Sequence, residues 1–163
     1  MTFPAALLSQ AESLLAAYRR AGLTVATAES CTGGLVAACL TEIAGSSDVF
    51  ECGFVSYSNA AKTALLGVPA ALIAKQGAVS TEVAEAMARG ALAHSKADAT
   101  IALTGVAGPG GGTAEKPVGL VHFSAIRRGG GMYCQRREIF SGDRAAVRLS
   151  SVAAALEMLD ALL

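Results

Sequence analysis

Apolar residues recur at three- and four-residue intervals in three long segments of the chain, which is the spacing of amphipathic helices. The first predicted helix spans residues 5–20 and can end at Gly22, the second begins after Ser80, and the third runs from Asp143 to the C-terminus. The apolar stripe of the third helix, residues 149–163, can pack on the sheet or on a second subunit, so a homo-oligomer is expected.

Short apolar runs between the helices predict strands. Shorter helical segments alternate with them, and the last two strands flank a glycine turn, so they should form an antiparallel hairpin. This order predicts an α/β fold, a three-layer α/β/α sandwich with a mixed, partly antiparallel sheet, as a single domain over residues 1–163. The predicted strands are 24–28, 49–56, 100–104, 118–127 and 132–140, with the turn at Gly129–Gly131, and the shorter helices are 35–43, 59–66 with Asn59 as N-cap, and one after Pro69.

The charge balance narrows the range of partners. The 163 residues include 13 basic and 13 acidic side chains, so the formal net charge is zero. Nucleic-acid surfaces need clustered lysine and arginine, and a bilayer span needs about 20 consecutive apolar residues; the chain shows neither. No signal peptide is expected, because the first residues carry no basic segment ahead of an apolar one. A cytoplasmic protein without nucleic-acid or membrane contacts is therefore expected.

Cysteine and histidine spacing argues against a metal site. The four cysteines, at positions 31, 39, 52 and 134, include no C-x-x-C pair, and the two histidines lie far apart. Zinc ligands come at short characteristic spacings. Neither a metal nor a disulfide framework is expected.

The segment around Ser30 predicts a strand-to-helix turn with candidate chemistry. Gly33 and Gly34 open the next helix, although glycine inside a helix costs about 1 kcal/mol relative to alanine. Glycines there would let a ligand approach the N–H groups of the first turn, which suit an oxyanion, and Ser30 could attack a carbonyl beside them. Alternatively, the hydroxyl of Ser30 or Thr32 caps the helix and the glycines allow close packing.

A serine nucleophile needs a base, and neither histidine has an obvious acidic partner in sequence. Lys62 is the candidate, because with Asn59 as N-cap it occupies the third helical position, where the helix dipole disfavours the ammonium form. Tyr57, just after the preceding strand, could relay a proton or hold the amine. The alternative is a surface lysine and a tyrosine packed at the sheet edge.

A glycine-rich loop follows the 100–104 strand. Thr104 ends that strand, and the segment from Gly105 to Gly119 contains six glycines, counting both ends. Open α/β sheets bind ligands at the carboxyl ends of their strands, so the loop is either a lid over a site or an irregular connection. It contains neither a P-loop nor a G-x-G-x-x-G helix opening, so no nucleotide cofactor is expected.

Two arginines begin the last predicted helix. Arg144 and Arg148 lie four residues apart at the helix end whose dipole repels cations, so a bound phosphate would resolve the conflict. Salt bridges to Asp143 or Glu138 are the alternative.

Together these segments resemble the CinA C-terminal domain family, whose enzymatic members are nicotinamide-nucleotide amidases. The resemblance extends from about Val25 to the last helix. It implies hydrolysis of the carboxamide of nicotinamide mononucleotide to nicotinate mononucleotide and ammonia, at a serine–lysine site without metal. Its motifs are T-A-E-S-C-T-G-G (27–34), I-A-G-S-S (43–47), V-S-Y-S-N-A-A-K (55–62), G-A-V-S (77–80), T-G-V-A-G-P-G-G-G-T (104–113), E-K-P-V-G (115–119) and F-S-G-D-R (140–144).

By this resemblance Ser30 is the nucleophile, Lys62 the base, Tyr57 an auxiliary in the proton path and Thr104 a further member of the polar cluster. Family members often carry an additional N-terminal nucleotide-hydrolysing domain, which is expected to be missing here. Ala60 and Cys52 depart from the residues common in relatives, but neither replaces the nucleophile or the base. The expected substrate-binding residues are Thr32, Gly33, Gly34, Gly105, Ala107, Gly108, Arg144 and Arg148.

Two other functions remain open from the sequence. The chain could be a non-catalytic module for nucleotide sensing or protein interaction, linked to competence or the DNA-damage response. It could also hydrolyse a different amide or a phosphoester.

Overall fold

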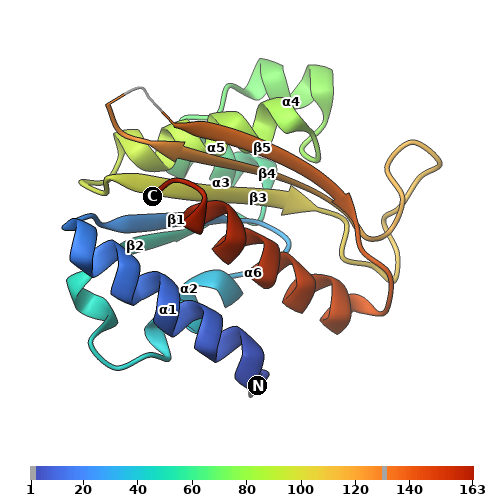
Figure 1. Ribbon diagram of the computed structural model, residues 1–163. Helices are drawn as coiled ribbons and strands as arrows, with labels where there is room; N and C mark the ends of the chain where they lie inside the picture. The colour runs from blue at the N-terminus through green and yellow to red at the C-terminus, as the bar shows by residue number, and fades with distance from the viewer. Residues whose placement is uncertain (1–2, 130–131) are drawn as a thin grey trace.

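The computed structural model describes residues 3–129 and 132–163, and it places five strands in one mixed sheet (Figure 1). The strand order is β2-β1-β3-β4-β5. β1 pairs in parallel with β2 and β3, whereas β4 is antiparallel to β3 and β5 is antiparallel to β4. The antiparallel hairpin is confirmed, although Gly130 and Gly131 of its predicted turn lie outside the described residues. The strands are β1 (Val25–Glu29), β2 (Phe50–Val55), β3 (Ala99–Gly105), β4 (Leu120–Arg127) and β5 (Tyr133–Ile139).

Helices cover both faces of this sheet, which confirms the predicted three-layer α/β/α sandwich with a mixed sheet. A short 3₁₀ turn, η1 (Ser46–Asp48), precedes β2 and was not predicted, because three residues carry no usable hydrophobic period. On one face lie α1 (Ala5–Ala21), α2 (Leu35–Thr41) and α6 (Arg144–Asp160), and on the other α3 (Asn59–Leu66), α4 (Ala70–Gln76) and α5 (Thr81–Ala93).

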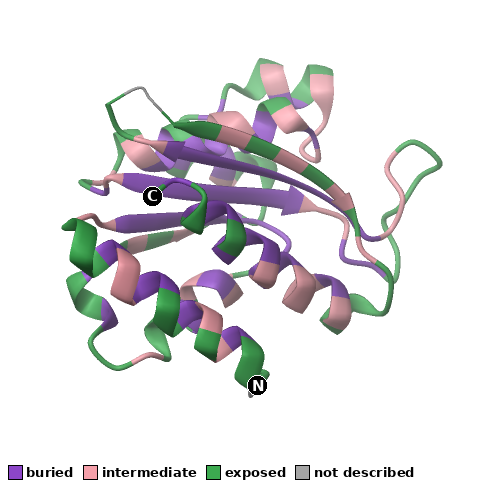
Figure 2. Cartoon of the chain, in the orientation of Figure 1, coloured by how far each residue is buried: buried purple, intermediate pink, exposed green. Residues whose placement is uncertain are grey.

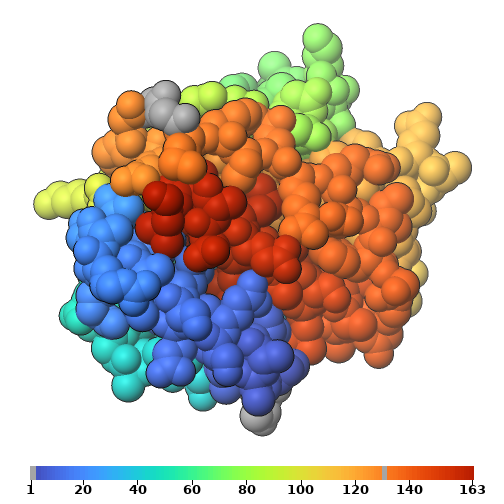
Figure 3. Space-filling view, in the orientation of Figure 1, coloured from blue at the N-terminus to red at the C-terminus, as the bar shows by residue number. Residues whose placement is uncertain are grey.

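The central strands are buried on both faces. Every residue of β1 is buried, and β3 and β4 are buried along nearly their whole length, while the edge strands β2 and β5 alternate between more and less exposed positions (Figure 2). Val152, Leu156 and Leu159 of α6 belong to the core between the sheet and α1. Most of the apolar stripe of α6 is thus used within the chain, and the C-terminal segment lies beside α1 in the space-filling view (Figure 3).

Most helix ends follow the predicted capping residues. Gly22 adopts a left-handed conformation after α1, and the hydroxyl of Ser80 accepts a hydrogen bond from the N–H of Val83. The prediction of Asn59 as N-cap is wrong: Ser58 caps α3, because its extended backbone lets its Oγ accept the N–H of Ala61 at 3.0 Å.

The topology brings three strand ends together. Because β2, β1 and β3 are parallel neighbours, their carboxyl ends meet at one edge of the sheet. The connection after β1 passes through α2 on one face, whereas the connection after β2 passes through α3, α4 and α5 on the other. This change of face beside β1 is where open α/β sheets form ligand crevices.

Candidate active site

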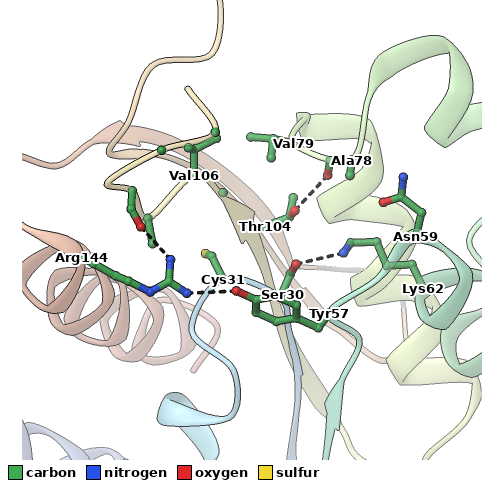
Figure 4. Close-up of a pocket in the computed structure, with 15 residues that line it drawn as sticks. Ser30, Cys31, Tyr57, Asn59, Lys62, Ala78, Val79, Thr104, Val106 and Arg144 are labelled. Atoms are coloured by element: carbon green, nitrogen blue, oxygen red, sulfur yellow. Dashed lines mark hydrogen bonds between the residues drawn. The ribbon is translucent and has the colours of Figure 1, made fainter. Parts of the chain in front are cut away.

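A cavity of about 290 Å³ lies at the carboxyl ends of β1 and β3 (Figure 4). Ser30 follows β1, Lys62 comes from α3, and Thr104 ends β3. The glycine-rich loop after β3 supplies one wall, as do Ala78 and Val79 from the connection between α4 and α5. The complete lining is Ser30, Cys31, Tyr57, Asn59, Lys62, Ala78, Val79, Thr104, Gly105, Val106, Ala107, Gly108, Gly110, Gly111 and Arg144.

Ser30 and Lys62 are in direct contact. Lys62 Nζ lies 2.9 Å from Ser30 Oγ and 2.9 Å from the carbonyl oxygen of Ser56, to which it donates a hydrogen bond. Ser30 is 8% exposed and Lys62 only 1%. Lys62 Nζ donates to both oxygens; when the amine is neutral, one N–H can stay on Ser56 while the nitrogen lone pair accepts the Ser30 hydroxyl proton.

Burial lowers the pKa of Lys62 below its ordinary value of 10.5. The main cause is removal of the ammonium from water, since among the described residues no salt bridge compensates its charge. The helix dipole was the expected cause of this pKa shift, but with Ser58 as N-cap the lysine is the fourth residue of α3, one position further from the positive end of the dipole. The direction of the shift agrees with the sequence argument, while its main cause is burial.

The turn after Ser30 differs from the predicted anion site. Gly33 and Gly34 have φ angles of 60° and 97°, so both are left-handed and glycine is the residue that adopts this backbone at low cost. The N–H groups that were expected to hold an oxyanion are occupied: Gly34, Val36 and Ala37 all donate to the carboxylate of Glu29. Neither the hydroxyl of Ser30 nor that of Thr32 caps α2.

Tyr57 does not contact the lysine amine. Its side chain is 60% exposed, and its hydroxyl accepts a hydrogen bond from Arg144 Nη2 at 3.0 Å. Arg144 also donates to the carbonyl oxygen of Gly108 at 2.8 Å, so the guanidinium links the tyrosine to the glycine-rich loop across the mouth of the cavity (Figure 4). The expectation that Tyr57 holds the amine is therefore wrong in this geometry.

The two arginines of α6 share one cavity, but only Arg144 also lines the cavity that contains Ser30. Arg148 does not line the Ser30 cavity; its Nη2 donates to the carbonyl oxygen of Thr32 at 2.7 Å. Together with Arg144, Ala107 and Val118, it lines a neighbouring cavity of about 620 Å³. No ion pair of the described residues involves either arginine, and Asp143 instead caps α6 by accepting the N–H of Ala146.

Of the remaining residues predicted to bind the substrate, some line the Ser30 cavity and others lie behind it. Gly105, Ala107 and Gly108 line the cavity, whereas Thr32, Gly33 and Gly34 do not. The hydroxyl of Thr104 donates to the carbonyl oxygen of Ala78 at 2.9 Å, which ties β3 to the opposite wall (Figure 4).

Sequence reasoning assigned no role to two groups beside the site. One is the carbonyl of Ser56, which no residue identity reveals. The other is Glu29, whose signal was visible as a charged residue directly after the predicted 24–28 strand and immediately before Ser30.

In the described part of the chain, no three histidine, cysteine, aspartate or glutamate side chains come close enough to form a metal site. The same residues contain no helix long and apolar enough to cross a membrane.

Comparison with known proteins places these residues in a family. The model of the CinA C-terminal domain matches residues 8–163. The chain belongs to the CinA C-terminal domain family. This CinA domain is 51% identical to the nicotinamide-nucleotide amidohydrolase PncC of Escherichia coli K12 over 154 residues, which cover 94% of this chain and 92% of that protein.

Two further proteins match the CinA domain over most of its length. A CinA-like protein of Geobacter sulfurreducens is 50% identical over 142 residues, which cover 87% of this chain but only 34% of that longer protein. The crystal structure of the competence/damage inducible protein CihA from Agrobacterium tumefaciens has 48% sequence identity and a TM-score of 0.96, and the match covers 99% of this chain and 98% of that one.

Proposed function

We propose that this protein is a nicotinamide-nucleotide amidase, which hydrolyses the carboxamide of nicotinamide mononucleotide to nicotinate mononucleotide and ammonia. The observation that carries the proposal is the 2.9 Å contact between Ser30 Oγ and the buried amine of Lys62. The name of the 51% identical E. coli relative supports the substrate. A buried amine beside a serine hydroxyl has the geometry of an activated nucleophile and its base.

In the first half-reaction, Lys62 Nζ accepts the Ser30 proton while Oγ forms a bond to the carboxamide carbon. The carbonyl oxygen becomes an oxyanion. The amide of Cys31, the residue after the nucleophile, is the nearest donor in sequence to stabilise it, since within the described residues its N–H donates to no other oxygen. The Lys62 ammonium then protonates the amide nitrogen, the carbon–nitrogen bond breaks, and ammonia leaves.

In the second half-reaction, water attacks the acyl group on Ser30. Lys62 accepts a proton from the water, the ester bond to Oγ breaks, and the proton returns to Ser30. The carbonyl oxygen of Ser56 holds the amine in place throughout, because it accepts one N–H in both protonation states.

Arg144 is the proposed contact for the 5′-phosphate of the nucleotide. Its guanidinium lines the cavity that contains Ser30 as well as the larger neighbouring cavity, so it can reach a group that extends from one into the other. Arginine binds phosphate through charge-assisted hydrogen bonds, and no carboxylate neutralises this guanidinium in the described structure. Arg148 is proposed as a support for the Ser30 turn instead, because it donates to Thr32.

The decisive experiment measures ammonia and inorganic phosphate together after incubation with nicotinamide mononucleotide. We expect ammonia release by the wild type and loss of release in Ser30→Ala and Lys62→Ala, with no phosphate in any sample. Full activity in either variant would contradict the assignment. Phosphate release would favour a phosphoesterase, and nucleotide binding without turnover would favour a sensing module.

A further inference from the structure

Glu29 is a fully buried carboxylate immediately before the candidate nucleophile, and the proposed reaction gives it no chemical step. It is 0% exposed and has no ion-pair partner among the described residues. Burying an unpaired carboxylate is costly unless hydrogen bonds replace its hydration. A charge kept at this position therefore needs a structural or functional reason.

Four donors replace the water around this carboxylate. Oε2 accepts the hydroxyl of Thr32 at 2.7 Å and the N–H groups of Gly34 at 3.0 Å and Val36 at 3.1 Å. Oε1 accepts the N–H of Ala37 at 2.9 Å. These are the amides that a helix leaves without partners at its N-terminus, where a negative charge is also favoured by the helix dipole.

α2 depends on this cap. The helix has seven residues, and its N-cap residue Gly34 has no side chain to accept a hydrogen bond. Helices this short are marginal in water without tertiary support. The two left-handed glycines before it also give the unfolded turn more conformational freedom than other residues would. Without the carboxylate, the turn from residue 30 to residue 34 would lose its main internal tie.

Backbone hydrogen bonds anchor the residues next to Ser30 as well. The backbone on either side is fixed to the sheet, since Ser56 N–H donates to Glu29 O at 2.9 Å and Ser30 N–H donates to Leu103 O at 3.1 Å. From there the Glu29 side chain reaches forward past Ser30 and holds the following turn. Arg148 holds that turn from the side of α6 through its contact with Thr32 O.

We infer that Glu29 is a positioning residue, whose carboxylate fixes the 30–34 turn so that Ser30 Oγ stays within reach of Lys62 Nζ. The inference rests on the proposed function only in that Ser30 must be the reacting group. Displacements of about 1 Å at a reacting atom can cost about 100-fold in rate, so a loosened turn lowers kcat while the distant nucleotide contacts keep KM. It also explains why the N–H groups of α2 are not the oxyanion site.

Glu29→Gln and Thr32→Val test this role at two strengths. Glutamine keeps the shape of Glu29 but loses its charge, and its NH2 group cannot accept the backbone N–H groups that donate to the carboxylate. Valine at position 32 removes only the hydroxyl that donates to Oε2. We expect kcat to fall about 10- to 100-fold in Glu29→Gln and about three- to tenfold in Thr32→Val, with KM changed less than about twofold in both.

Asp98→Asn is the matched control. The carboxylate of Asp98 accepts hydrogen bonds from the N–H and the hydroxyl of Thr24. Thr24 directly precedes β1, so Asp98 anchors the end of this strand that lies away from Glu29 and Ser30. We expect Asp98→Asn to lower the melting temperature and to leave kcat per folded molecule unchanged. A merely structural role for Glu29 would give the same result in Glu29→Gln and would overturn the inference.

A second measurement separates this inference from the choice of substrate. A fluorophosphonate probe reacts with activated serines, and peptide mass spectrometry reports its rate of attachment to Ser30. We expect slower labelling in Glu29→Gln than in wild type and Asp98→Asn, even if nicotinamide mononucleotide proves not to be the substrate. Equal labelling rates in all three proteins would overturn the positioning role, whereas labelling without ammonia release would overturn only the proposed substrate.

Discussion

The inner wall of the Ser30 cavity, which contains Ser30 and Lys62, buries its polar side chains, whereas the outer wall, which contains Tyr57 and Arg144, exposes them to solvent. On the inner wall, Ser30 and Lys62 are at most 8% exposed and their partners are fixed by strands and short helices. On the outer wall, Tyr57 is 60% exposed and Arg144 reaches across the cavity mouth from the first turn of α6. Exclusion of water strengthens electrostatic effects on the inner wall, whereas the outer wall remains open to an incoming ligand.

This difference suggests a division of labour: the inner wall performs the chemistry and the outer wall recognises the nucleotide. Substitutions on the inner wall should then change kcat, and substitutions on the outer wall should change KM. An inner-wall variant that changes mainly KM, or an outer-wall variant that changes mainly kcat, would show that the walls do not act separately.

The largest effect is expected from Lys62→Met. Methionine fills much of the same space but cannot accept the Ser30 proton, so kcat for ammonia release should fall about 100- to 10,000-fold, the range that a general base supplies. Steady-state kinetics measure this effect. Lys75→Met, an exposed lysine on α4, is the control and should retain wild-type kcat. A Lys62→Met enzyme with more than a tenth of wild-type kcat would contradict the role of the inner wall.

Arg144→Glu should raise KM about 10- to 100-fold while kcat changes far less, because a charge-assisted hydrogen bond to phosphate is replaced by repulsion. The comparison substrate is nicotinamide riboside, which lacks the phosphate and should respond much less. Arg20→Glu, at an exposed position of α1, makes the same change in net charge away from the cavity. Equal KM values for Arg144→Glu and Arg20→Glu would remove Arg144 from phosphate recognition.

Stability should depend on pH through Lys62. Its pKa is lowered in the folded protein by burial, so between that pKa and 10.5 the unfolded chain binds more protons and the free energy of unfolding rises with pH. Lys62→Met removes this dependence. Urea unfolding should therefore show Lys62→Met more stable than wild type at neutral pH, with the difference shrinking toward pH 10.5. A difference that grows with pH would mean that the ammonium is stabilised by its site.

The smallest effect is expected from Tyr57→Phe. The variant loses the exposed hydrogen bond to Arg144, so KM should rise about two- to fivefold and kcat should stay within about twofold. Tyr133→Phe is the control. It loses a comparable exposed hydrogen bond, from Tyr133 on β5 to Glu85 on α5, and should change neither KM nor kcat. A drop in kcat above tenfold for Tyr57→Phe would support a role of the tyrosine in the proton path and contradict the division between the walls.

Much of the fold was predictable because its signals are local. The helix stripes and the caps Gly22 and Ser80 each depend on residues within a few positions. Ser58 and Asn59 show the limit of local reasoning: both residue types cap helices, and the backbone conformation at Ser58 decides between them.

The sequence predicted which residues lie at the candidate site better than it predicted which hydrogen bonds they make. Ser30 and Lys62 are 32 residues apart, and their contact depends on the parallel pairing of β1 with β2. The contacts of Tyr57 with Arg144 and of Glu29 with α2 depend on side-chain directions in the assembled fold, which no spacing in the sequence encodes. For the same reason, the sequence could not reveal that the N–H groups of α2 were already occupied.

The most direct test of the Ser30–Lys62 pair is the rate of Ser30 phosphonylation by a fluorophosphonate probe as a function of pH. In wild type, the rate should rise with pH through a pKa below 10.5 and then level off, because the neutral amine of Lys62 activates the hydroxyl. Lys62→Met should label at least about 100-fold more slowly and without that transition. Equal rates and equal pH profiles in the two proteins would contradict the account.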